Sequence, residues 1–148
     1  MKGTALFLSV MLAVSVAQAA EPVPSAKTSA RPDWFMVDQN YESAFFYDRA
    51  GVVRGEKGVM QVTTRILYTD LGKAETQKVE SLKQLENLFE TRFITEVSCG
   101  EHKSRLQRVT HLDDGGKPIK VFDLAGKTDW EEIPPGSRLD KVAETECR

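Results

Sequence analysis

Residues 134–147, PPGSRLDKVAETEC, form the stretch that decides how this chain folds. The two prolines and the glycine end the preceding segment, and Ser137 can cap a helix by accepting a hydrogen bond from the backbone N–H of Asp140. Four apolar side chains then recur at helical spacing on one face: Leu139, Val142, Ala143 and Cys147. We therefore expect a helix over about residues 138–146, with a buried stripe that continues into the last cysteine.

The other cysteine ends a stretch with the period of a β-strand. Residues 93–99 read FITEVSC, and their alternation places Cys99 on the same face as Phe93 and Val97. Both cysteines thus point inward from their elements, which is the condition for a disulfide between a strand and a helix packed on it. We expect the intramolecular bond Cys99–Cys147 in an oxidising compartment; two free thiols or an intermolecular bridge are the alternatives.

The rest of the domain is predicted to be mainly strands. Three stretches rich in β-branched and aromatic residues cover WFMV (34–37), SAFFYD (43–48) and VMQVTTRILY (59–68), with turn signals at 48–51 and 55–58. Two more strands are expected at residues 105–112 and 118–123, joined by the turn DDGG. Residues 75–89 change to helical spacing, which predicts a helix. The pattern is that of an α+β domain, an antiparallel meander with a C-terminal helix.

The first residues have the features of a secretory signal peptide. Lys2 precedes the apolar run ALFLSVMLAVSV (5–16), and AQA (17–19) fits a signal-peptidase site. A membrane-spanning helix is the alternative, but such a helix needs roughly 20 residues. We expect cleavage after Ala19, and no lipid anchor, because Ala20 stands where a lipoprotein carries its acylated cysteine.

After the signal peptide, residues 20–33 are predicted to be a flexible leader because they are rich in proline and small polar residues. Residues 34–148 are predicted to form one domain. The whole chain has a net charge of −2 and no basic stripe that could follow a phosphate backbone, so we expect no nucleic-acid partner. The predicted location is periplasmic or secreted.

Groups that could carry chemistry are few. His102 and His111 are too far apart along the chain to bind one ion without a turn between them, and we expect both to be exposed. The DDGG motif (113–116) is a hairpin turn rather than a calcium loop, and Glu131 and Glu132 face opposite ways on an extended segment. With both cysteines used in a disulfide and no G-x-S-x-G motif, we expect no catalytic, metal or cofactor site.

The aromatic strand SAFFYD carries apolar bulk on both faces. Phe45 and Tyr47 lie on one face and Phe46 lies on the other. If the C-terminal helix covers one face, the other must be covered either by the helix predicted at 75–89 or by a second subunit, because large exposed apolar patches are rare. Trp130 precedes the last helix and is expected to be a lid on the edge of the core. These four aromatic residues form the candidate interaction face.

Three segments of the chain resemble the surface-adhesin protein E-like domain family. They are CGEHKSRLQRV (99–109), the DDGG turn, and the ending WEEIPPGSRLDKVAETEC (130–147). The last segment matches most specifically, at Trp130, Ile133, Pro135, Gly136, Ser137, Leu139 and Cys147. The likeness covers about residues 34–147, although the helical stretch at 75–89 is longer than the family pattern.

The resemblance implies an antiparallel sheet of about six strands, with the C-terminal helix fastened to its concave face by the cysteine pair. It also implies an envelope location, homodimerisation through the sheet, and adhesion to host proteins for the named member. We expect a non-catalytic cell-envelope module that binds an envelope or host protein through a sheet edge or the uncovered sheet face. The alternative is a periplasmic small-ligand carrier that uses the cavity between sheet and helix.

Overall fold

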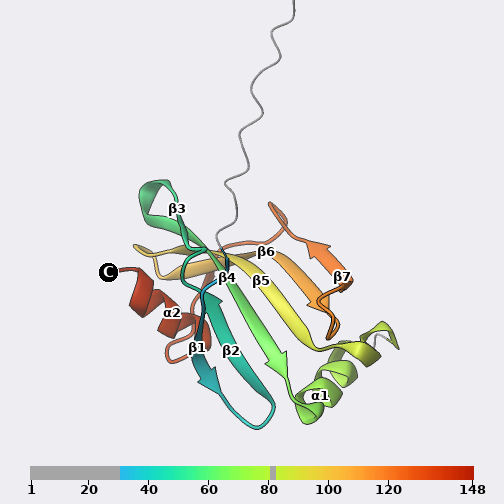
Figure 1. Ribbon diagram of the computed structural model, residues 1–148. Coiled ribbons are helices and arrows are strands. Elements are labelled where there is room, and N and C mark those ends of the chain that lie inside the picture. The colour runs from blue at the N-terminus through green and yellow to red at the C-terminus, as the bar shows by residue number, and fades with distance from the viewer. Residues whose placement is uncertain (1–30, 81–82) are drawn as a thin grey trace, which may run out of the picture.

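The computed structural model describes residues 31–80 and 83–148. The predicted signal peptide, and the predicted leader up to residue 30, lie outside these ranges. The strands are β1 Trp34–Gln39, β2 Ser43–Asp48, β3 Val53–Arg54, β4 Val59–Tyr68, β5 Glu90–Ser98, β6 Lys103–Leu112, β7 Pro118–Asp123 and β8 Glu131–Glu132. The helices are α1 Asp70–Glu80 and α2 Arg138–Glu146, with short 3-10 helices η1 Glu56–Gly58 and η2 Lys83–Asn87 (Figure 1).

The strands form one antiparallel sheet. Its order is β1-β2-β4-β5-β6-β7, and the two short strands β3 and β8 pair with β4 and β6. The β6–β7 turn is the predicted DDGG turn, in which Gly116 has a φ of 78° and donates its N–H to the Asp113 carbonyl at 3.1 Å. The predicted α+β fold, the meander and its six main strands are confirmed.

The hydrophobic core lies between this sheet and α2. Helix α2 begins as predicted, because the Ser137 hydroxyl accepts from the Asp140 backbone N–H at 3.1 Å. Val142 of the helix is fully buried. The core cluster comprises Phe45, Tyr47, Met60, Val62, Val97, Ile133, Val142 and Ala143. The apolar residues on one face of α2 therefore pack against the apolar residues on one face of the sheet.

A disulfide joins Cys99, directly after β5, to Cys147, directly after α2. Their Cα atoms are 5.4 Å apart, which lies within the ordinary range for a disulfide. The same end of the helix is also held by Glu146, whose carboxylate accepts from the Tyr47 hydroxyl at 2.8 Å and pairs with Arg54 at 3.0 Å. The predicted link between the sheet and the terminal helix is confirmed.

The helix predicted at residues 75–89 has different bounds. α1 begins at Asp70 and ends at Glu80, and the five residues of η2 form a separate 3-10 helix. The start is set by Thr69, whose hydroxyl accepts from the Gly72 backbone N–H at 3.3 Å and donates to the Glu42 carbonyl at 3.0 Å. Gly72 packs so closely on Glu42 that an added Cβ would lie 2.0 Å from its carbonyl oxygen. These contacts come from the β1–β2 turn, so local periodicity could not predict them.

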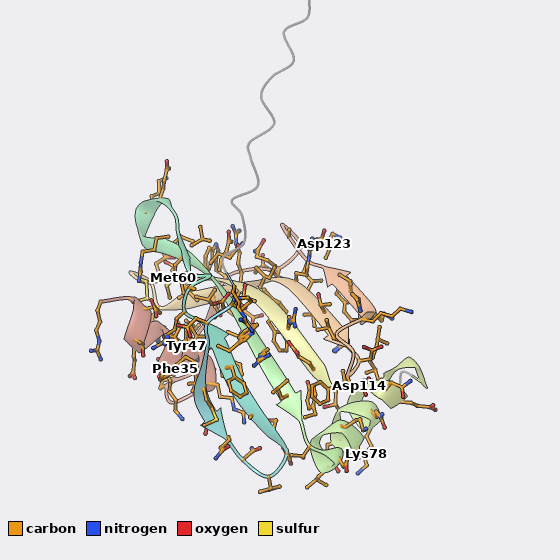
Figure 2. All side chains as sticks on the ribbon, viewed as in Figure 1. Phe35, Tyr47, Met60, Lys78, Asp114 and Asp123 are labelled. Carbon is orange, nitrogen blue, oxygen red and sulfur yellow. A yellow bond between two sulfur atoms is a disulfide. The ribbon has the colours of Figure 1, made fainter. Side chains whose placement is uncertain are left out.

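Neither helix of the described ranges has the length and apolarity that a membrane-crossing helix needs. α1 instead lies past the ends of β4 and β5, at the opposite end of the sheet from the disulfide (Figure 1). Figure 2 shows the same separation, with Lys78 and Asp114 near α1 and with Tyr47 and Phe35 near α2. The sheet therefore has one face covered by a helix.

Candidate functional site

The two faces of the sheet differ in what covers them. We call the face under α2 the closed face; it carries Phe45 and Tyr47, which are 6% and 2% exposed. We call the opposite face, which carries Phe46, the open face. Within the described part of the chain no helix lies across the open face (Figure 1). The predicted option that the 75–89 helix covers it is therefore wrong for these residues.

The centre of the open face is a row of arginines and aromatic rings. Strand register places Phe46 of β2 opposite Arg65 of β4, and Arg65 opposite Arg92 of β5. The Arg65 guanidinium lies 4.3 Å from the centre of the Trp34 ring and 4.9 Å from the centre of the Phe46 ring. The Arg92 guanidinium is 5.9 Å from the Trp34 ring. A cation over an aromatic face contributes about 0.5–2 kcal/mol, depending on how far it is desolvated.

One carboxylate serves both arginines. Glu90 Oε1 accepts from Arg92 Nε, and Glu90 Oε2 lies 4.0 Å from Arg65 Nη1. Like charges on directly opposed positions repel each other, and the Glu90 side chain, only 7% exposed, offsets this repulsion. Burial lowers the pKa of Arg65 from its usual value. Two guanidiniums against one carboxylate leave this cluster with a surplus positive charge.

A second pair of the same kind lies near the other edge of the open face. Glu96 and Arg105 are opposed on β5 and β6, and the Arg105 Nε lies 2.5 Å from Glu96 Oε2. The Arg105 guanidinium also lies 4.6 Å from the centre of the Trp130 ring. Trp130 thus contacts an arginine of the open face, rather than forming the lid that we predicted on the core edge. Gln107 donates to the same Glu96 oxygen at 3.2 Å.

The predicted interaction face is therefore divided between the two sides of the sheet. Phe45 and Tyr47 are buried under α2 and cannot contact a protein partner in this structure. Phe46 and Trp130 lie with arginines and are partly exposed. The residues that sequence reasoning missed are Trp34, Arg65, Arg92 and Arg105. The alternation of polar and apolar residues in the sequence could have placed each arginine on one face of its strand. The contacts of the arginines with aromatic rings depend on strand register, which the sequence does not reveal.

The polar candidates have structural partners. His111, predicted to be exposed, is only 2% exposed, and its Nδ1 lies 2.8 Å from the Thr91 hydroxyl, so that prediction was wrong. Strand register places His111 opposite Thr91 of β5, and the hydrogen bond between them compensates for burial of the ring nitrogen. His102 is half exposed, and its Nε2 lies 3.0 Å from Asp140. No group of three or more metal-ligating side chains gathers within residues 31–80 and 83–148.

The open face carries residue types that are enriched at protein interfaces. Tryptophan and arginine are the residues most enriched among those that dominate binding energy at protein interfaces, and here each arginine is already oriented by a ring and a carboxylate. No protein-family model matches the chain, and no curated protein matches its sequence. The resemblance to the surface-adhesin protein E-like domains therefore stays a prediction.

Proposed function

We propose that this chain is an exported, non-catalytic module of the bacterial cell envelope that binds a protein through the open face. The observation that carries the proposal is the row formed by Trp34, Phe46, Arg65 and Arg92 on a sheet face that neither described helix covers. If a helix covered this face, the rings of Trp34 and Phe46 would be buried in a core. Instead they are partly exposed and lie beside charged arginines.

The surplus positive charge of the two guanidiniums favours a partner surface that carries negative charge. Arg65 and Arg92 share Glu90, so a carboxylate from a partner would complete the pairing of the more exposed Arg92. Trp34 and Phe46 would meet apolar side chains beside it. We therefore propose a partner surface that combines an apolar centre with acidic groups.

The disulfide supports the proposed location. Disulfides persist in oxidising compartments such as the periplasm, and the Cys99–Cys147 bond accompanies a predicted signal peptide. The resemblance to the surface-adhesin protein E-like family supports an envelope or host protein as partner. A second copy of the chain, bound face to face, is the other partner that this resemblance implies.

Native mass spectrometry of the tagged protein purified from periplasm tests the proposal. We expect the wild-type chain to retain a stoichiometric protein partner, and Arg92→Glu to lose it, because charge reversal repels the acidic groups. Arg148→Glu is the matched control, since Arg148 is exposed at the far end of α2, and it should retain the partner.

The measured masses also separate the two kinds of partner. A mass of twice the chain identifies a second copy, and a different added mass identifies another protein. A wild-type chain that stays monomeric in periplasm, outer membrane and culture medium would contradict the proposal. Equal partner retention by Arg92→Glu and wild type would also contradict it.

A further inference from the structure

A slot of about 380 Å³ opens on the closed face, beside the first turn of α2. This volume falls in the range of about 300–1,000 Å³ that is usual for small-ligand sites. Its apolar lining comes from three strands of the sheet, from the segment that leads into α2 and from the first turn of that helix: Phe45, Ile66, Phe93, Pro134 and Leu139. The slot lies on the opposite side of the sheet from the arginine row.

Hydroxyl groups and one cation complete the lining. Thr64, Thr95 and Ser137 contribute to the wall, and among the described residues that line the slot Arg138 alone is charged. The Arg138 guanidinium lies 5.6 Å from the centre of the Phe45 ring, so the charge stands directly at the apolar surface. A site with apolar walls and a single cation selects ligands that have an apolar body and one acidic group.

The charges around Arg138 leave a positive surplus at the slot. Its Nε lies 3.7 Å from Asp38 Oδ2, and Lys141 Nζ lies 3.4 Å from the same oxygen. The hydrogen bond from Lys141 lowers the pKa of Asp38, so this carboxylate stays ionised near neutral pH. Two cations thus face one anion, which favours a second carboxylate.

Arg138 also has donors to offer. Its Nη1 donates to the Ser43 hydroxyl at 3.0 Å, and its Nη2 lies 3.5 Å from the Ser43 carbonyl. Each of these nitrogens carries two N–H groups, so each can donate a second hydrogen bond. Both terminal nitrogens already face Ser43, so the remaining N–H groups diverge, and each can donate a charge-assisted hydrogen bond to one oxygen of an anion.

We infer that this slot binds a small anionic amphiphile, whose aliphatic or aromatic body lies between the sheet and α2 and whose carboxylate pairs with Arg138. The slot is then the site of the predicted carrier function, with a small anionic amphiphile as the ligand class. Ligand binding in this slot is independent of protein binding at the open face. Because α2 supplies one wall, and Cys147 fixes the far end of that helix, ligand affinity should also depend on the disulfide.

Titration of the oxidised, isotope-labelled protein with decanoate, followed by NMR, tests the inference. We expect saturable shifts at Ile66, Phe93 and Leu139, and decanoate should bind about tenfold more tightly than uncharged decanol. Arg138→Gln should reduce the decanoate affinity to that of decanol and leave decanol binding unchanged. Reduction of the disulfide should weaken the binding of both probes.

Three further variants keep this test decisive. Arg148→Gln removes an exposed arginine outside the slot and should leave decanoate binding unchanged, as should Arg92→Glu on the open face. Should Arg138→Gln fail to fold, Arg138→Lys retains the charge without the guanidinium's several planar donors and should show an intermediate affinity. Equal affinities for decanoate and decanol would overturn the inference. Shifts scattered outside the slot, or no saturable shift, would overturn it too.

Discussion

The two faces of this sheet come from the same strands but differ in their side chains and in what covers them. On the closed face, Phe45, Val62 and Val97 pack under α2, and a disulfide fixes the helix on them. On the open face, the intervening positions hold arginines that are matched to rings and carboxylates. The core cluster of the closed face excludes water, whereas the open face keeps charged groups beside its partly exposed rings. The comparison separates what stabilises the domain from what a partner would contact.

Removal of the disulfide should have the largest effect. Closing a loop over a sequence separation of 48 predicts a loss of about 4 kcal/mol in the Cys99→Ser/Cys147→Ser double variant. We expect a lower melting temperature by circular dichroism and faster protease cleavage within α2, because a helix of nine residues is marginal without packing. Equal melting temperature and protease resistance with and without reductant would contradict this role.

The open face should respond most strongly to loss of its buried carboxylate. Glu90→Gln leaves Arg65 and Arg92 opposed without an anion between them, and we expect a loss of about 2 kcal/mol in the free energy of unfolding measured in urea. Asp123→Asn is the matched control, because Asp123 pairs with Arg108 at 3.7 Å on an exposed site, where an ion pair contributes about 0.5 kcal/mol or less. Equal losses of unfolding free energy in the two variants would show that Glu90 stabilises the domain no more than an exposed ion pair does.

The closed face also predicts a pH dependence. Burial, and then the hydrogen bond to Glu146, raise the pKa of Tyr47 from 10.0 to about 12. Between these values the unfolded chain has lost the phenolic proton that the folded chain keeps, so this contribution is complete below pH 10 and is lost as the pH rises to about 12. Tyr47→Phe should cost about 1 kcal/mol at neutral pH and should flatten the fall in stability above pH 10. An unchanged fall would contradict the assignment.

The smallest effect on stability is expected at the edge of the open face. Trp130→Ala removes the ring over Arg105 and should lower the free energy of unfolding by about 0.5 kcal/mol, while binding of the proposed partner falls strongly. Chemical unfolding and native mass spectrometry of the same sample measure the two quantities. A large loss of stability would show that Trp130 belongs to the core after all.

Local patterns predicted the closed face well. Alternation around Cys99 and helical spacing before Cys147 act within single elements, and the cap at Ser137 needs only the next three residues. The open face could not be predicted in the same way, because the contact of Arg65 with Trp34 joins β4 to β1. The predicted start of the helix was wrong for the same reason, because α1 begins where Thr69 is held by the carbonyl of Glu42, a residue in the distant β1–β2 turn. Contacts that depend on register or on a distant turn leave no local signal.

Photo-cross-linking in cells tests the central claim most directly, namely that the open face is the surface that meets a protein. A benzophenone amino acid is placed either at Phe46, on the open face, or at Glu144, exposed on α2. We predict one defined adduct from position 46, lost when Arg92→Glu is added, and none from position 144. An adduct from position 144 alone, or an adduct from position 46 that survives Arg92→Glu, would contradict the claim.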